Sequence, residues 1–230
     1  MASLLVALDD GLVEPDDTVS VGNGSYNYFG QWMKDSHPPK ASRLSVQQAF
    51  ETSSNVGISR IISQHYAKRP EAFLEKLHSF GLGKPLGLEI SGEGKPRIKS
   101  TTDKDFNTRV SIPWISIGYE SKLTPLQTLA FYNAVANNGR MVRPRLVREL
   151  RYHGKLVKEF GTQVIRDSIA SPEAIQIMRS MLEGVVEHGT ASSLNKSPYK
   201  IAGKTGTAQI NNPKFGYDVS HRSYQASFVG

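Results

Sequence analysis

Two short polar runs, far apart in the chain, carry residue types suited to acyl transfer. The first is Ser-Ser-Asn at 53–55, placed between two stretches with apolar helical periodicity. The second is Gly-Lys-Thr-Gly-Thr-Ala at 203–208, which is bordered by apolar residues and reads as a strand. Glycine inside a strand often marks the close approach of a ligand or another backbone. A lysine charge and two threonine hydroxyls on such an edge suit an extended ligand that ends in a carboxylate.

The two runs are more informative together than apart. Ser and Asn commonly break or cap helices, so the triplet 53–55 alone is weak. Enzymes that are acylated on serine need a hydroxyl and an amide beside the nucleophile, and a cation and hydroxyls for the substrate carboxylate. That pairing, together with a Ser-x-x-Lys motif, is typical of penicillin-binding proteins and β-lactamases.

Nucleotide and metal sites fit the sequence poorly. A P-loop needs a glycine five residues before Gly203, where Pro198 stands, and a helix directly after the lysine. The Gly81-Leu82-Gly83 run follows a helical pattern and lacks dinucleotide spacing. The six histidines show no paired spacing on one helix face, and no carboxylate pair stands out. We therefore expect no metal and no cofactor.

The composition is that of a globular chain with a basic surface. The net charge of +7 comes from basic residues scattered through 230 residues, with no aromatic-basic motif, so we expect no nucleic-acid partner. The absence of cysteine excludes disulfides and a cysteine nucleophile. No stretch approaches the 18 apolar residues typical of a membrane span.

Helix signals dominate the first three quarters of the chain. Residues 2–8 are apolar nearly all round, which predicts a buried helix that ends at Gly11. Helices are also predicted from Ser45 to 52, from 56 onward and over 71–80. The clearest start is Thr124-Pro125, with Gln127 three residues after the cap, and Leu126, Leu129, Ala130 and Ala134 as its buried stripe. Residues 12–44 and 84–123 are predicted to be irregular or hairpin-like insertions.

The last third adds strands. A hairpin is predicted over 147–160 with its turn at His153-Gly154, and a helix from Ser171 to Gly189. Two strands follow, at 200–209 and 224–229, with a polar excursion between them. Helices that flank a late antiparallel pair indicate an α+β domain.

Three ordered motifs carry a resemblance to a known family. Ser-Ser-Asn-Val-Gly at 53–57, the helix from Thr124 to its exit at Pro144, and Lys-Thr-Gly-Thr-Ala at 204–208 occur in family order. The chain resembles the transpeptidase domain of class B penicillin-binding proteins, most closely the division-specific type, penicillin-binding protein 3. Asn55 favours that type, because aspartate is common there in the elongation type. Glu120 is a departure, since many relatives carry glycine after Gly118-Tyr119.

The resemblance implies a β-lactamase/transpeptidase-like α+β fold over 1–230, an antiparallel sheet flanked by an all-helical subdomain. It also implies that early strands, the last strand and the nucleophilic Ser-x-x-Lys lie outside this chain, the latter just before residue 1. Two Ser-x-x-Lys strings, at 193–196 and 197–200, come too late and open no apolar helix. We therefore expect the 230-residue chain itself to be inactive.

Roles for the site residues also follow from the resemblance. Ser53 relays protons between Lys204 and the motif lysine, and Asn55 hydrogen-bonds the substrate amide. Thr205 and Thr207 bind the terminal carboxylate along a substrate-binding strand that includes Gly206. The Thr207 N–H supplies half of the oxyanion hole.

The implied reaction is cross-linking of peptidoglycan stem peptides that end in D-Ala-D-Ala, with β-lactams as mimics. The implied setting is the extracytoplasmic, periplasmic face of the cytoplasmic membrane, with an N-terminal anchor and division-complex membrane proteins including a glycosyltransferase. Two alternatives remain open at this stage. One is a penicillin-sensing receptor domain, and the other is a non-catalytic scaffold that binds the cell wall.

Overall fold

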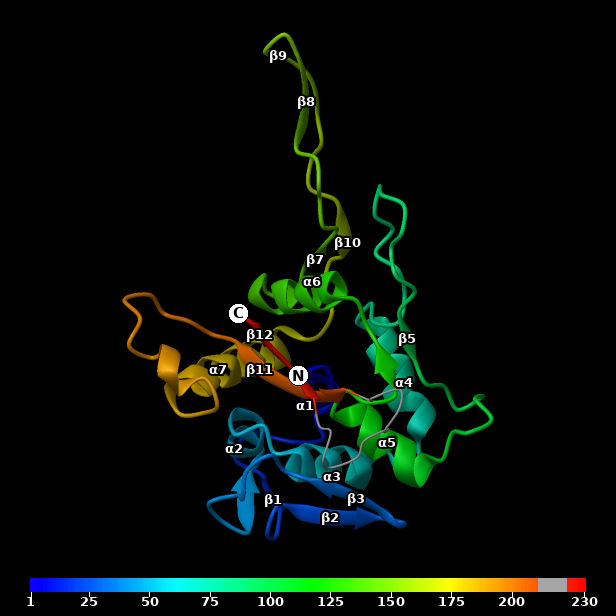
Figure 1. The fold of residues 1–230 in the computed structure, drawn as a ribbon, viewed down its shortest axis with the longest axis vertical. Helices are drawn as coiled ribbons and strands as arrows, with labels where there is room; N and C mark the ends of the chain where they lie inside the picture. Colours follow the sequence, from blue (N-terminus) through cyan, green and yellow to red (C-terminus); the bar gives the residue numbers. More distant parts are fainter. Residues whose placement is uncertain (211–222) are drawn as a thin grey trace.

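The computed structural model describes residues 1–210 and 223–230 (Figure 1). The helices are α1 Ala2–Asp9, α2 Val46–Glu51, α3 Asn55–Tyr66, α4 Pro70–Ser79, α5 Thr108–Ser116, α6 Pro125–Ala136, α7 Pro172–Glu187 and the 3-10 turn η1 Ser192–Leu194. The strands are β1 Thr18–Ser20, β2 Ser25–Tyr28, β3 Gln31–Lys34, β4 Arg43–Ser45, β5 Arg97–Ile98, β6 Ser121–Lys122, β7 Met141–Val142, β8 Glu149–Tyr152, β9 Lys155–Glu159, β10 Val164–Arg166, β11 Lys204–Ile210 and β12 Ser223–Val229.

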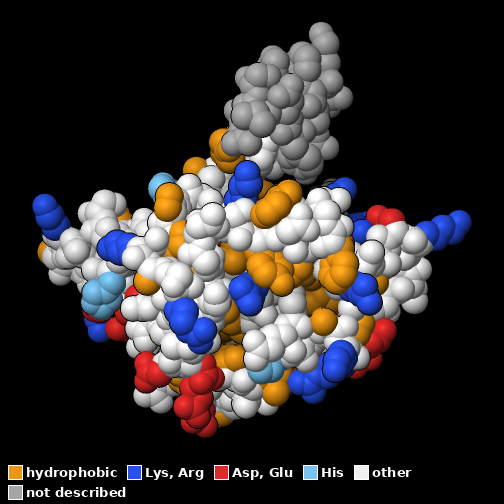
Figure 2. Space-filling view, turned by 90° about the horizontal axis from the view of Figure 1, so that it is seen from below, with side chains coloured by type: hydrophobic (Ala, Val, Ile, Leu, Met, Phe, Trp, Pro, Cys, Tyr) orange, Lys and Arg blue, Asp and Glu red, His pale blue; other side chains and the backbone are white. Residues whose placement is uncertain are grey.

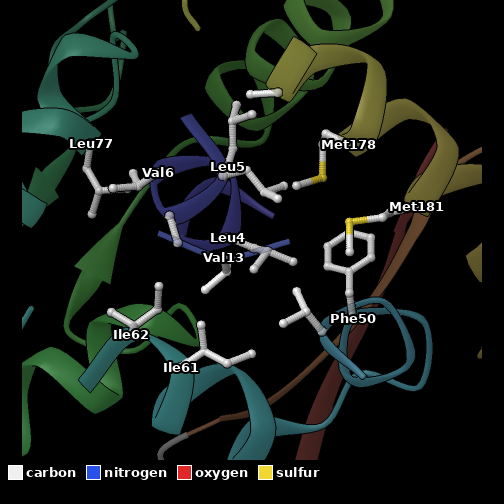
Figure 3. Packing of buried hydrophobic residues seen from close by; sticks show 14 of the residues in the cluster. Leu4, Leu5, Val6, Val13, Phe50, Ile61, Ile62, Leu77, Met178 and Met181 are labelled. Carbon is white, nitrogen blue, oxygen red and sulfur yellow. The ribbon is translucent and has the colours of Figure 1, made fainter. Parts of the chain in front are cut away.

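Helix α1 lies at the centre of the core, as its apolar sequence predicts. Its residues Leu4 to Ala7 are almost completely buried, and α3, α4 and α7 pack around it. Figure 3 shows this packing, in which the surrounding side chains are Phe50, Ile61, Ile62, Leu77, Met178 and Met181. Burial of each such side chain contributes roughly 1.5–3 kcal/mol. The core therefore holds the N-terminal end of α1 in a fixed place, and that end borders the site described below.

Local capping signals predict the starts of three helices correctly. Ser45 and Thr124 each form a complete capping box, with Gln48 and Gln127 respectively. Ser171 caps α7 through the backbone N–H of Ala174. These helices begin where the sequence places them because the caps satisfy backbone donors locally.

One residue of α6 that was predicted to be buried is exposed, and a polar residue is buried instead. Leu129 is 52% exposed, whereas the polar Gln127 is 2% exposed. The Gln127 amide closes the capping box and donates to the Lys84 carbonyl, which compensates its burial. The burial of Gln127 is not predictable from the apolar stripe, because a polar residue is expected to face solvent.

The insertion 12–44 is a small β unit beside α3 (Figure 1). Strand β1 pairs with β4, and β2 forms an antiparallel hairpin with β3. Its contacts with α3 run through β1 and β3. The end of β3 therefore lies against the start of α3.

The segment 84–123 is not irregular throughout, which corrects the prediction. It contains α5, capped by Asn107, and the short pair β5–β6. The glycines and prolines between Pro85 and Pro96 make the segment read as a loop, and Pro113 inside α5, which removes a backbone donor, gives no helix signal. Ile112 and Ile115 are buried where α5 packs on α3, and this tertiary contact outweighs the proline.

Strands β11 and β12 form an antiparallel pair in which Lys204 faces Val229 and Thr207 faces Ala226. Strand β11 begins at Lys204 instead of residue 200, and just before it the Gly203 N–H donates to the Leu182 carbonyl on α7 instead of to a strand. The polar excursion predicted between the strands falls mainly on 211–222, outside the described residues. The hairpin β8–β9 projects from the body as an arm (Figure 1), with its turn at His153-Gly154 as predicted.

The surface agrees with a solvated basic chain. Lysine and arginine side chains are dispersed over the face in Figure 2 and form no single continuous patch there. Across 1–210 and 223–230, none of the helices combines the length and apolarity needed to cross a membrane.

Candidate active site

The two polar runs of the sequence line one cavity of about 530 Å³. The α2–α3 turn contributes Ser53 and Asn55, and β11 contributes Lys204 and the next three residues. The N-terminal end of α1 closes another side through Met1, Ala2 and Ser3. All six predicted site residues are therefore brought together: Ser53, Asn55, Lys204, Thr205, Gly206 and Thr207.

Ser53 occupies a strained turn between two helices. Its φ of +56° lies in the left-handed region, which costs a non-glycine residue on the order of 1 kcal/mol. The next residue, Ser54, caps α3 by accepting from the Gly57 N–H at 2.9 Å. The two adjacent serines thus have different tasks, since Ser54 starts a helix and Ser53 faces the cavity.

The insertion hairpin holds this turn in place. The Asp35 carboxylate accepts from the Ser54 hydroxyl at 2.8 Å and from the Val56 N–H at 2.9 Å. The Asn55 amide donates to the Lys34 carbonyl at 2.9 Å. Burial raises the pKa of Asp35, and the hydrogen bonds that its carboxylate accepts oppose that shift. Asp35 is not among the site residues predicted from the sequence, and no local signal identifies it, because its partners are about twenty residues away.

Lys204 is the electrostatic centre of the cavity. Its Nζ donates to the Ser53 Oγ and, at 3.1 Å, to the Thr205 carbonyl, and it lies 5.7 Å from the Phe50 ring centroid. Burial lowers the pKa of Lys204 to about 8. A lysine in this range can exchange a proton with a hydroxyl in contact with it.

Gly203, just before β11, and Gly206 within β11 both lie close to β12. A Cβ at Gly203 would lie 2.5 Å from the Val229 carbonyl oxygen, and one at Gly206 would lie 2.6 Å from the Ser227 Oγ. Close approach of the β12 backbone therefore accounts for Gly203 without a ligand, whereas the contact at Gly206 is with a side chain that can rotate. Among the described residues, β11 pairs with β12 alone, so its other edge has no strand partner.

Threonines define the outer part of the site. The Thr205 Oγ1 lies 2.6 Å from the Thr190 Oγ1, in the turn after α7. Thr207 is exposed. Thr190 was missed because it belongs to neither polar run, and a lone threonine after a helix carries no distinguishing pattern.

The structure shows how glutamate is accommodated at position 120, where many relatives carry glycine. Its φ of +55° is left-handed, the conformation in which glycine is free of strain. The carboxylate pairs with Lys99 at 2.9 Å, which holds the residue in place.

The remaining candidates do not reach the cavity. Both Ser-x-x-Lys strings lie on the largely exposed segment 192–200, and none of their residues lines the cavity. In 1–210 and 223–230, no three His, Asp or Glu side chains gather closely enough to hold a metal ion.

A model of the penicillin-binding protein transpeptidase domain matches residues 1–230, the whole chain. The chain belongs to this family. Penicillin-binding protein PbpB of Mycolicibacterium smegmatis is 33% identical over 221 residues, which cover 91% of this chain and 32% of that protein. The transpeptidase-domain chain thus spans about a third of the length of the curated relatives it matches.

Solved structures give the same fold. Penicillin-binding protein 3 of Mycobacterium tuberculosis, in its apo form, superposes with a TM-score of 0.80 at 27% identity, covering 99% of this chain and 50% of that one. Its complex with ampicillin gives the same values. The predicted β-lactamase/transpeptidase-like fold and the resemblance to penicillin-binding protein 3 are therefore confirmed.

Proposed function

We propose that the protein carrying this chain is a peptidoglycan D,D-transpeptidase of septal wall synthesis, and that residues 1–230 form part of one transpeptidase domain. The observation that carries this proposal is the contact of Lys204 with Ser53 inside a cavity that the start of β11 also lines. Septal synthesis is favoured over elongation by Asn55 and by the similarity to penicillin-binding protein 3.

The stem peptide would bind as an added strand along the edge of β11 opposite β12, where no strand of the described residues pairs. Its terminal carboxylate would accept hydrogen bonds from the Thr205 and Thr207 hydroxyls, in the field of the Lys204 cation. Gly206 would keep the backbone between the two threonines accessible. The Thr207 N–H would donate to the oxyanion that develops on the penultimate D-Ala carbonyl.

The chemistry is serine acyl transfer in two steps. A serine hydroxyl attacks the penultimate D-Ala carbonyl, its proton passes to a base, and the terminal D-Ala leaves with a proton on its amine. An acceptor amine then attacks the ester, takes the acyl group and returns the proton to the serine. Ser53 and Lys204 would deliver a proton to the leaving amine in the first step and carry the proton lost by the entering amine back to the serine in the second. Asn55 would orient the substrate amide.

The attacking serine is proposed to be that of a Ser-x-x-Lys motif outside 1–230. Met1 to Ser3 line the cavity, which supports a nucleophile adjoining the start of α1. The chain alone would then form no covalent adduct with a penicillin. Acylation by β-lactams is proposed by analogy with M. tuberculosis penicillin-binding protein 3, which has been solved in complex with aztreonam and with ampicillin.

The biological setting is part of the same proposal. The domain would act at the extracytoplasmic, periplasmic side of the cytoplasmic membrane, held by an anchor and associated with division-complex membrane proteins including a glycosyltransferase. Peptidoglycan occurs at that side of the membrane, which is the reason for this placement.

Release of D-alanine from a D-Ala-D-Ala stem peptide tests the activity in the full-length protein. Lys204→Ala should lower kcat/KM at least about 100-fold, in the range of an essential proton-transfer group. Lys158→Ala, on the projecting arm, serves as the matched control and should leave the rate unchanged. The proposal fails if the full-length wild type releases no D-alanine, or if Lys204→Ala behaves like the control.

A further inference from the structure

One residue, Thr190, contacts both walls of the cavity. Its backbone N–H donates to the Glu51 carbonyl at 3.1 Å, two residues before Ser53. Its hydroxyl lies 2.6 Å from that of Thr205 on β11. Thr190 therefore connects the turn that bears the first polar run to the strand that bears the second.

The contact with Glu51 is tightly constrained. A Cβ at Gly189 would lie 2.3 Å from the Glu51 carbonyl oxygen, and one at Gly184 would lie 1.9 Å from the Glu51 Oε1. Glu51 itself is 6% exposed, and its carboxylate accepts from the Gln47 amide at 2.7 Å. The two glycines allow the end of α7 to close onto α2, which leaves the Thr190 backbone little freedom to move away from β11.

The number of protons on the two hydroxyls decides which threonine donates to the other. Each threonine hydroxyl has one proton to donate and can also accept. A carboxylate is acceptor-only, so binding it requires the Thr205 proton. Thr190 must then donate to Thr205, and the two hydroxyls form a chain in which each hydrogen bond polarises the next.

We propose that Thr190 is a positioning residue that directs the Thr205 hydroxyl toward the terminal carboxylate of an extended peptide ligand and thereby sets selectivity for a free carboxylate. This inference rests on the proposed function. Thr190 acts through Thr205, so its removal should weaken carboxylate recognition while the Lys204–Ser53 contact remains.

The test compares two peptides on the full-length protein. One peptide ends in D-Ala-D-Ala, and the other is identical except for a C-terminal carboxamide. Ligand-observed NMR gives both dissociation constants, and their ratio is the carboxylate preference. Thr190→Val removes the hydroxyl at nearly constant size, Thr190→Ser keeps it, and Thr162→Val in an exposed loop is the matched control.

Thr190→Val should reduce the preference about 5-fold, the effect of losing one ordinary hydrogen bond. Thr190→Ser and Thr162→Val should retain it, and the Tm of each variant should match that of the wild type. A purely structural role would weaken both peptides equally and leave the ratio unchanged.

The outcomes separate this inference from the proposed function. If the wild type prefers the carboxylate and Thr190→Val keeps the full preference, the positioning role is refuted and the transpeptidase proposal stands. If the wild type binds both peptides equally, the carboxylate site itself is refuted, and the role of Thr190 with it. Loss of the preference in Thr190→Ser would also overturn the inference, because that variant keeps the donor.

Discussion

Replacement of Lys204 by methionine should change how stability depends on pH. Methionine is similar in length and apolar, so Lys204→Met removes the charge while largely filling the space. The folded pKa of Lys204 is about 8, against an ordinary 10.5. The folded state therefore binds fewer protons than the unfolded state between these pH values, and stability rises with pH across that window.

The size of the effect follows from the shift. A separation of 2.5 between the two pKa values corresponds to roughly 3 kcal/mol, because each pKa unit is worth about 1.4 kcal/mol. Since Lys204 is only partly buried, solvent screening should reduce this to roughly 2 kcal/mol. Below pH 8 the wild type carries the whole cost of burying the charge, and above pH 10.5 it carries none. Lys204→Met carries none at any pH but loses the hydrogen bond to Ser53, about 1 kcal/mol.

The assay is urea unfolding of both proteins at several pH values from 7 to 11. The difference in unfolding free energy, wild type minus Lys204→Met, should become more positive by roughly 2 kcal/mol between pH 7 and pH 11. Every other titrating group is common to both proteins and cancels to first order. A difference that stays constant with pH would refute the buried, pKa-lowered lysine.

Three further substitutions probe the surroundings of the cavity. Asp35→Ala should destabilise the protein by about 1–3 kcal/mol in urea unfolding, because the Val56 N–H loses its acceptor at the start of α3; an unchanged midpoint would contradict the anchoring role. Gly203→Ala should lower the unfolding free energy, measured by thermal unfolding, by about 1–3 kcal/mol, because its Cβ would lie 2.5 Å from the Val229 carbonyl oxygen. An unchanged Tm would show that β12 can shift to make room. Glu120→Gly should leave the unfolding free energy within about 1 kcal/mol of the wild type, because relief of the left-handed strain offsets the lost ion pair. Glu120→Ala keeps the strain and loses the ion pair, so it should be less stable than Glu120→Gly.

The parts of the fold that the sequence predicts well depend on interactions between residues close together in the chain. Ser45 and Thr124 start helices because each cap finds its partner three residues later, and the turn at His153-Gly154 depends on two adjacent residues. The buried α1 follows from composition alone. The Pro113 helix is the opposite case, since burial against α3 decides it and no short window contains that information.

At the site, too, the residues set by local sequence are predictable and those set by long-range contacts are not. The two polar runs are recognisable because residue types at fixed spacing carry the chemistry, and the structure brings them into one cavity. Asp35 and Thr190 were missed because their importance lies in contacts with residues 19 and 15 positions away. Gly203 and Gly206 show a further limit, because glycine in a strand pattern indicates close approach but does not say whether a ligand or a neighbouring strand approaches.

The most direct test of the acyl-transfer site is intact-mass measurement of the full-length protein after incubation with ampicillin. We predict one adduct with the mass of ampicillin, located by peptide mapping on a Ser-x-x-Lys serine outside 1–230, and formed at least about 100-fold more slowly in Lys204→Ala. The account would be contradicted by the absence of an adduct, by an adduct on a serine within 1–230, or by an unchanged rate in Lys204→Ala.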